Sequence, residues 1–285
     1  MVCKYRVAIV VDSSSCIPKE MQEQYGLHVV PHALIVDGKA YRDGVDMEPG
    51  RFYELLRTNQ SVLSTASPRP VDFLDAYTQA SKEGESVLCL TVSHTFASAY
   101  NSARVATEMA ASSLPDTPVT VVDTRTAAGA MGLITLEAAR RAHEGASMEE
   151  VLQRVQEIIP KVNLIALLDT LYYLARGGRV PKVAAWAGTL LGMKPIAEMR
   201  LGEARLLEKP RSRSKAIERM FALMKEQVST EPIHVNVMHT DALKDAELFR
   251  DQVAQTFRCA ELFISEFTPM MGAHLGPGLV GVAFY

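Results

Sequence analysis

The sequence predicts an α/β protein in which strands alternate with helices around a largely parallel sheet. Two patterns support this: short apolar runs rich in valine and isoleucine, and intervening stretches with apolar residues three and four positions apart. The length of 285 residues suggests two domains or one large one, because a domain usually has roughly 100 to 200 residues. We place a boundary near residue 158, which divides the chain into residues 1–158 and 159–285.

The first half of the chain has the clearest alternation of strands and helices. Buried strands are expected at residues 7–11, 87–92, 119–122 and 164–168, and residues 27–35 and 40–42 read as the arms of a hairpin. Helices are expected at residues 70–82, 98–112, 127–143 and 148–159. Gly145 and Ser147 separate the last two helices as a stop and a restart. We expect the strands before residue 158 to form a mostly parallel sheet, and the strand at 164–168 to open the second half of the chain.

The second half shows a different order of elements. We expect helices at 170–176, 180–191, 212–228 and 242–257, strands at 234–238, 262–267 and 279–284, and a polar hairpin whose arms are 193–201 and 204–208. The expected sheet of this half is mixed.

Composition excludes several classes of function. The net charge of -3 and the pI near 6.2 give no positive field for nucleic acid. The four cysteines form no Cys-x-x-Cys pair, and no histidine spacing suits zinc, so we expect reduced thiols in a cytoplasmic protein without metal or cofactor. No apolar run reaches the roughly 18 residues of a membrane span, and no signal segment opens the chain.

Hydroxyl side chains follow several predicted strands. They occur in Asp12-Ser13-Ser14-Ser15, in Ser93-His94-Thr95 and in the expected loop Ser64-Thr65-Ala66-Ser67. Each one alone is read most simply as a helix cap. Together, with free amides at helix ends, they suit a small oxyanion such as a carboxylate or phosphate, because ligands collect beyond the carboxyl ends of strands in such sheets.

A histidine among glycines precedes the last strand. The segment Gly272-Ala273-His274-Leu275-Gly276-Pro277-Gly278 reads as a loop in which a ligand could approach the backbone closely, although a lone histidine is often structural. Arg179 follows Gly177-Gly178 and could either meet an anion or brace the turn. No serine-hydrolase elbow or nucleotide-binding loop is found, and Cys16, without a basic partner, reads as a buried thiol.

In this order, five segments resemble the DegV family of bacterial fatty-acid-binding proteins, which includes the acyl-binding subunit of fatty acid kinase. They are Val11-Asp12-Ser13-Ser14-Ser15, Thr65-Ala66-Ser67-Pro68-Arg69-Pro70, Leu171-Tyr172-Tyr173-Leu174 with Gly177-Gly178-Arg179-Val180, Lys194-Pro195-Ile196, and the glycine-rich segment around His274. The resemblance runs nearly end to end. It implies a two-domain DegV-like fold.

The resemblance also implies a site. A fatty acid would lie between the two domains with its carboxylate held by Thr65, Ser93 and His274, with Arg179 near the head group, and Ser67, Gly272 and Ala273 complete the expected ligand-binding set. Ala66 and Ala97 depart from the family pattern, in which polar residues are usual, and Cys16 stands where an aspartate is common.

The function implied by the resemblance is non-catalytic: the protein would present the carboxylate of a long-chain fatty acid to a separate kinase subunit, which forms an acyl phosphate for phospholipid synthesis. Two alternatives are an acyl or phosphoryl transfer enzyme that uses His274, and a lipid-responsive regulatory sensor. A basic cluster reads as a solvated helix start, or as a point of transient membrane contact. Its members are Lys209, Arg211, Arg213, Lys215 and Arg219.

Overall fold

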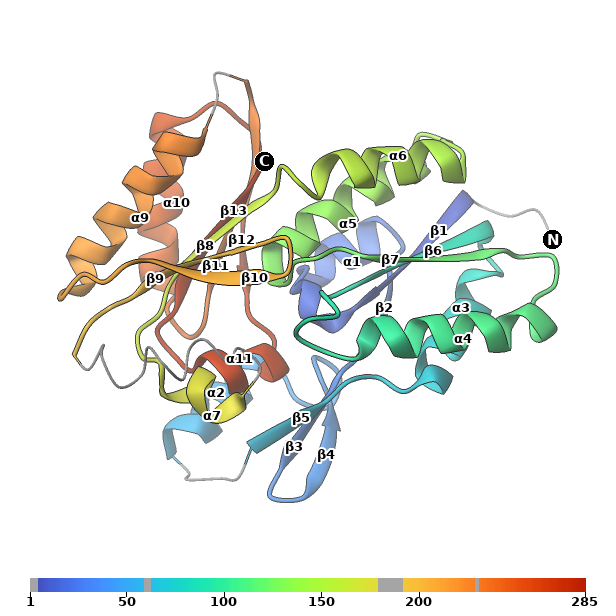
Figure 1. Ribbon diagram of the computed structural model, residues 1–285, viewed down its shortest axis with the longest axis horizontal. Coiled ribbons are helices and arrows are strands. Elements are labelled where there is room, and N and C mark those ends of the chain that lie inside the picture. The colour runs from blue at the N-terminus through green and yellow to red at the C-terminus, as the bar shows by residue number, and fades with distance from the viewer. Residues whose placement is uncertain (1–4, 59–62, 179–191, 229–230) are drawn as a thin grey trace.

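The computed structural model describes residues 5–58, 63–178, 192–228 and 231–285, and three sheets form its framework (Figure 1). The first sheet has the strand order β2-β1-β6-β7 and is parallel throughout. Its strands are β1 (Tyr5–Asp12), β2 (His28–Val30), β6 (Gly84–Thr91) and β7 (Val119–Asp123). Valine, leucine and isoleucine on both faces of β1 and β6 are buried, as expected for a parallel sheet covered by helices.

Helices cover both faces of the first sheet. They are α1 (Lys19–Gln24), α3 (Pro70–Ala80), α4 (Ala99–Ser113), α5 (Ala128–His143) and α6 (Met148–Ile158), and a short 3-10 turn, Ser13–Ser15, follows β1. Helix α5 is buried along most of its length because it packs against β1 of the first sheet and against β11 and β13 of the next sheet. It therefore joins the two halves of the protein (Figure 1).

The second sheet is mixed and has the order β10-β9-β8-β13-β11-β12. Its strands are β8 (Asn163–Leu167), β9 (Ile196–Arg200), β10 (Glu203–Glu208), β11 (Ile233–His239), β12 (Cys259–Glu266) and β13 (Val280–Phe284). Strands β11 and β12 pair in parallel, and the other described pairs of this sheet are antiparallel. Helices α9 (Arg213–Gln227) and α10 (Leu243–Thr256) pack on it, with Met220, Met224 and Phe249 in the buried layer.

A small antiparallel sheet lies beside the junction of the two large sheets (Figure 1). It contains β3 (Ala33–Val36), β4 (Lys39–Arg42) and β5 (Leu63–Ala66). Helix α2 (Pro49–Thr58) contributes Phe52 and Tyr53 to the small core around Leu34. The expected hairpin is present, but its first arm splits between two sheets at Pro31, which has no N–H to continue a ladder.

Several local expectations were wrong. Residues 64–66 form strand β5 rather than a loop, because they pair with β3. The glycine-rich segment is not a loop at His274 either: it belongs to helix α11 (Pro269–Leu275), which begins with a proline and ends at Gly276 with φ 72°. Glycine is required at position 272 because a Cβ there would lie 2.6 Å from Tyr53 Oη.

Other expectations are confirmed or remain open. The mostly parallel first sheet and the mixed second sheet are present as predicted, and the expected short helix near residue 170 is α7 (Tyr172–Gly177). The predicted helix at 180–191 lies outside the described residues. The domain boundary near residue 158 stays a prediction. In the described parts of the chain, no helix has both the length and the apolar character that crossing a membrane requires.

Candidate functional site

A cavity of about 550 Å³ lies between the two large sheets and the small sheet. Its size falls within the roughly 300 to 1,000 Å³ of typical small-molecule sites. Residues from the loops that follow strands of the first sheet, from the small sheet, from β9 and from helices α7 and α11 form its wall. The lining residues are Ser14, His32, Thr65, Ala66, Ser67, Val92, Phe96, Ala97, Ser98, Ala127, Leu174, Met199, Met270, Met271, His274 and Leu275. Most of this wall is apolar, so the cavity suits a ligand with a substantial hydrocarbon part.

An apolar hollow of about 90 Å³ adjoins the cavity. The two share Ala127, Leu174, Met199, Met271 and Leu275, so they are neighbouring parts of one interior space. The hollow reaches the face of the second sheet, where further alanines and large apolar side chains line it. These are Ala128, Leu164, Ala166, Leu168, Ala197, Ala204, Phe267 and Leu279.

One polar pair on the cavity wall joins the small sheet to helix α11. Thr65 on β5 and His274 in the last turn of α11 approach so that the threonine Oγ1 lies 2.8 Å from the imidazole Nε2. A Cβ at position 177 would lie 2.7 Å from Nδ1 of the same ring, so only glycine lets α7 approach His274 this closely. The pair offers a hydroxyl and an imidazole, two groups that can hydrogen-bond a carboxylate.

A second hollow lies against the same pair. It has a volume of about 120 Å³ and is lined by Leu63, Ser64, Thr65, Tyr173, Arg176, Gly177, Ala273 and His274. Thr65 and His274 border both spaces, so they stand between the main cavity and this hollow. Ala273 lines this hollow beside His274, and Arg176, which was not predicted from the sequence, places a cation on the same wall.

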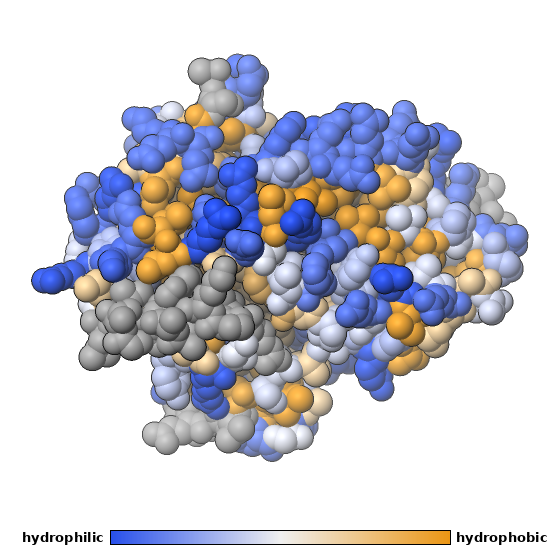
Figure 2. Space-filling view, viewed as in Figure 1, coloured by the Kyte–Doolittle hydropathy of each residue, from blue (hydrophilic) through white to orange (hydrophobic). Residues whose placement is uncertain are grey.

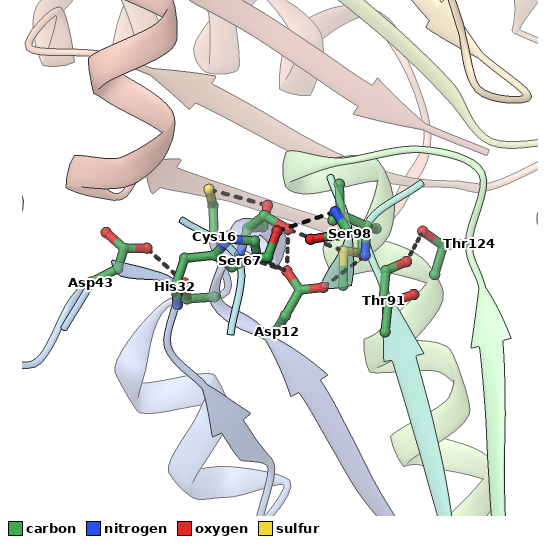
Figure 3. A network of polar contacts seen from close by, with 12 residues as sticks. Asp12, Cys16, His32, Asp43, Ser67, Thr91, Ser98 and Thr124 are labelled. Carbon is green, nitrogen blue, oxygen red and sulfur yellow. Dashed lines mark hydrogen bonds and ion pairs between the residues drawn. The ribbon is translucent and has the colours of Figure 1, made fainter. Parts of the chain in front are cut away.

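Ser67 lies on the cavity wall where β5 meets the start of α4. Its Oγ accepts a hydrogen bond from the backbone N–H of Ser98 at 3.1 Å (Figure 3). Ala66 and Ala97, the two departures from the family pattern, also line the cavity here. The wall beside Ser67 is thus less polar than the family pattern implies.

Two expected site residues, Ser93 and Gly272, do not line the main cavity. Ser93 is buried, but it is not among the residues that line the cavity, and its hydroxyl lies 3.0 Å from that of Thr95. Gly272 packs against α2 rather than against the cavity. The tip of the β9–β10 hairpin lies beside the Ser93 loop, where the Thr95 hydroxyl donates to the Gly202 carbonyl at 2.9 Å. Arg179 lies outside the described residues.

A buried polar cluster lies at the end of β1, where polar side chains were predicted at Asp12 to Ser15, and it includes His32 and Asp43, which were not predicted. Asp12 accepts hydrogen bonds from the Ser14 hydroxyl, from the Val92 backbone N–H at 2.7 Å and from His32, whose Nε2 lies 3.2 Å away (Figure 3). Burial by itself would raise the pKa of Asp12, but the hydrogen bonds and the charge interaction with His32 hold that pKa below its ordinary value. His32 and Ser14 line the main cavity. A buried histidine inside an otherwise strand-like apolar run was the available signal.

Asp43 and Cys16 complete this cluster. Asp43 accepts from the Ser13 hydroxyl at 2.7 Å and from the Met270 backbone N–H at 2.8 Å, while burial raises its pKa. Burial also raises the pKa of the Cys16 thiol to about 12, so this thiol stays protonated at neutral pH and is a poor nucleophile. Among the described residues, no group of three His, Cys, Asp or Glu could hold a metal ion.

The fold and the cavity define a class of protein: an α/β protein whose two large sheets enclose an apolar space with a hydroxyl–imidazole pair on its wall. Comparison with known proteins gives the family. The model of the DegV family, described as uncharacterised proteins, matches residues 6–285. The chain therefore belongs to the DegV family.

Individual relatives agree along the whole chain. The DegV domain-containing protein TTE1491 of Caldanaerobacter subterraneus is 34% identical over 98% of both chains. A DegV family protein from Thermus thermophilus, whose structure is described as showing fatty acid binding, has a TM-score of 0.90 and 28% identity over 98% of this chain and 99% of its own. DegV of Bacillus subtilis, described as a fatty acid binding protein, has a TM-score of 0.87 and 27% identity over 98% of this chain and 99% of its own.

Proposed function

We propose that this protein binds one long-chain fatty acid, with the carboxylate at Thr65 and His274 and the hydrocarbon tail in the main cavity and its apolar extension. The observation that carries the proposal is the position of the Thr65–His274 pair, 2.8 Å apart, on the wall of a largely apolar cavity. The fatty acids that the Thermus thermophilus and Bacillus subtilis relatives are described as binding support the choice of ligand.

The energetics of such a complex favour the tail as the source of affinity. Each buried methylene contributes about 0.8 kcal/mol, so a chain of roughly 16 carbons gains on the order of 12 kcal/mol before the cost of association is subtracted. The carboxylate contributes orientation instead, because removing it from water costs several kcal/mol unless hydrogen-bond donors replace its hydration. Thr65 Oγ1–H and the imidazole of His274 are the donors that we assign to it, with their contact to each other giving way to the carboxylate.

We further propose that the protein is a non-catalytic carrier that presents the carboxylate to a separate kinase subunit. In that reaction a carboxylate oxygen attacks the γ-phosphorus of ATP, the bond to the β-phosphate bridging oxygen breaks, and ADP leaves with its electrons. The hollow of about 120 Å³ on the other side of Thr65 and His274 supports this, because it offers space beside the carboxylate, with Arg176 on its wall.

Incubating the lipid-loaded protein with ATP tests the carrier role. The proposal predicts no ADP from the protein alone, and ADP with acyl phosphate when the catalytic subunit of a bacterial fatty acid kinase is added. Acyl phosphate from the protein alone would instead support the transfer-enzyme alternative. Fatty acid bound without turnover in either mixture would leave storage or sensing as the role.

Transient membrane contact belongs to the same proposal, through the basic cluster. Three of its cations are paired: Arg213 with Asp169 and Asp245, Lys215 with Glu218, and Arg219 with Glu208. Lys209 and Arg211 are the remaining members, so the attraction to anionic lipid is expected to be weak. Converting both to glutamate should lower co-sedimentation with phosphatidylglycerol vesicles; unchanged sedimentation would remove membrane contact from the proposal.

A further inference from the structure

A second polar position interrupts the apolar wall of the main cavity. His32, in the short connection between β2 and β3, is only 3% exposed and lines the cavity together with Ser14. Two hydrogen bonds fix the residue: its backbone N–H donates to Ser13 Oγ at 3.1 Å, and its Nε2 lies 3.2 Å from Asp12 Oδ1. Because Nε2 is bound to Asp12, the second ring nitrogen, Nδ1, needs a hydrogen-bond partner of its own.

The contacts of His32 decide which nitrogen is available. Asp12 is buried and accepts four hydrogen bonds, from His32, from the hydroxyl and the backbone N–H of Ser14 and from the Val92 N–H, so it is an ionised, acceptor-only carboxylate. Nε2 of His32 must then carry a proton. Nδ1 has no hydrogen-bond partner within the described parts of the chain, and in the neutral ring it presents a lone pair.

The chemistry of this nitrogen selects among ligand groups. A methylene beside Nδ1 would leave a buried polar atom unsatisfied, which is unfavourable. A carboxylate has only acceptor atoms and would face the lone pair of the neutral ring. A hydroxyl can donate to the neutral imidazole and can accept from a protonated one, so it fits both states of His32.

The register of the small sheet gives the distance between the two polar positions. Leu34 of β3 lies opposite Thr65 of β5, and Ala33 lies opposite Ala66. His32 is two residues before Leu34, so it lies about 7 Å along the strand from the level of Thr65, at 3.3 Å per residue. A fatty acid held at Thr65 would therefore meet His32 several carbons from its carboxylate.

We infer that the preferred ligand is a long-chain fatty acid with a hydroxyl group on its chain, and that His32 binds this hydroxyl through Nδ1 while Ser14 lies beside it. The inference rests on the proposed function, because it concerns the same cavity and the same carboxylate position. It narrows the ligand to hydroxylated fatty acids, which neither the Thr65–His274 pair nor the apolar lining requires.

Titration calorimetry of the lipid-free protein tests the inference. The ligands are stearic acid and a series of hydroxystearic acids that differ in the position of the hydroxyl. One hydroxylated isomer is expected to bind about tenfold more tightly than stearic acid, the effect of one satisfied buried hydrogen bond. His32→Gln should abolish the preference. His28→Gln, a change of the nearby histidine on β2 that pairs with Glu83 instead, should keep it.

The outcomes separate the two proposals. Equal or weaker binding of every hydroxylated isomer, with stearic acid still bound, would overturn the hydroxyl inference alone and assign Nδ1 to a water molecule. Failure of all these acids to bind would overturn the proposed function and the inference together. If His32→Gln does not fold, the comparison of isomers on the unchanged protein still decides the question.

Discussion

Two histidines face the same cavity from opposite kinds of surroundings. His274 sits at the end of a short helix, lies 2.8 Å from a neutral hydroxyl on Thr65 and borders two spaces. His32 is almost fully buried, lies against the carboxylate of Asp12 and faces only the main cavity of those described. The partner of each histidine therefore favours a different ligand group: the neutral hydroxyl beside His274 is compatible with a ligand anion, whereas the carboxylate of Asp12 beside His32 favours a neutral group.

The largest expected effect comes from removing the anchor of His32. Asp12→Ala should lower the free energy of unfolding by about 3 to 5 kcal/mol, because the change leaves buried polar partners uncompensated. Urea unfolding measures it, and Asp116→Ala, a change in an exposed loop, should stay within about 0.5 kcal/mol of the wild type. A loss below about 1 kcal/mol would mean that the cluster around His32 is not held as described.

The apolar extension gives the next largest effect. Ala197 lines it, and Ala197→Leu would occupy room for about three methylenes, so binding of an 18-carbon acid should weaken by about 2.4 kcal/mol. A 10-carbon acid, whose tail need not reach the extension, serves as the control and should bind equally to both proteins. If both acids lost the same binding free energy, the tail of the longer acid would not occupy the apolar extension.

The hydroxyl beside His274 should contribute less than the tail. Thr65→Val keeps the volume of the side chain and removes one hydrogen bond, so fatty acid binding should weaken by about 1 kcal/mol, or roughly fivefold. Thr120→Val, a matched change on β7 away from the cavities, should bind as the wild type does. If Thr65→Val bound the fatty acid as tightly as the wild type, Thr65 would not be a hydrogen-bond partner of the carboxylate.

The pH dependence of stability distinguishes the carboxylates of the His32 cluster and should be the smallest effect. The pKa of Asp12 is lowered in the folded protein, so its contribution is fully present above the ordinary value of 3.8 and is lost as the pH falls through the folded pKa. The pKa of Asp43 is raised, so protonation of this group favours the folded state as the pH falls.

Urea unfolding between pH 6 and pH 2 checks these signs. Asp12→Asn should reduce the loss of stability in acid, while Asp43→Asn should increase it. Parallel curves for wild type and both variants would contradict the assigned directions.

Much of the fold could be predicted because hydrophobic periodicity reports burial along each element. The strands around residues 7–11 and 87–92 and the helix at 127–143 are found close to their expected positions. Strand β5 and helix α11 were misjudged, since β5 depends on pairing with distant β3 and α11 on packing against α2. Residues 64–67 contain two serines and a threonine, and residues 272–278 contain three glycines and a proline, which favour loops when distant neighbours are ignored.

The site was predicted unevenly for the same reason. Thr65, Ser67, Ala273 and His274 border the described spaces, but Ser93 does not line the main cavity. Its neighbour Thr95 contacts Gly202, more than 100 positions away, which the local sequence does not reveal. His32 was missed because its importance comes from Asp12, which lies on another strand. Local sequence identifies which side chains can do chemistry, whereas tertiary contacts decide which of them face the ligand.

The proposed position of the fatty acid can be measured directly by nuclear magnetic resonance. The protein is loaded with palmitic acid that carries ¹³C either at the carboxyl carbon or at the terminal methyl. We expect Thr65→Val to shift the carboxyl signal and to leave the methyl signal unchanged, while Ala197→Leu does the reverse. The proposed position would be wrong if the carboxyl signal shifted in Ala197→Leu but not in Thr65→Val. It would also be wrong if no signal of bound fatty acid were seen.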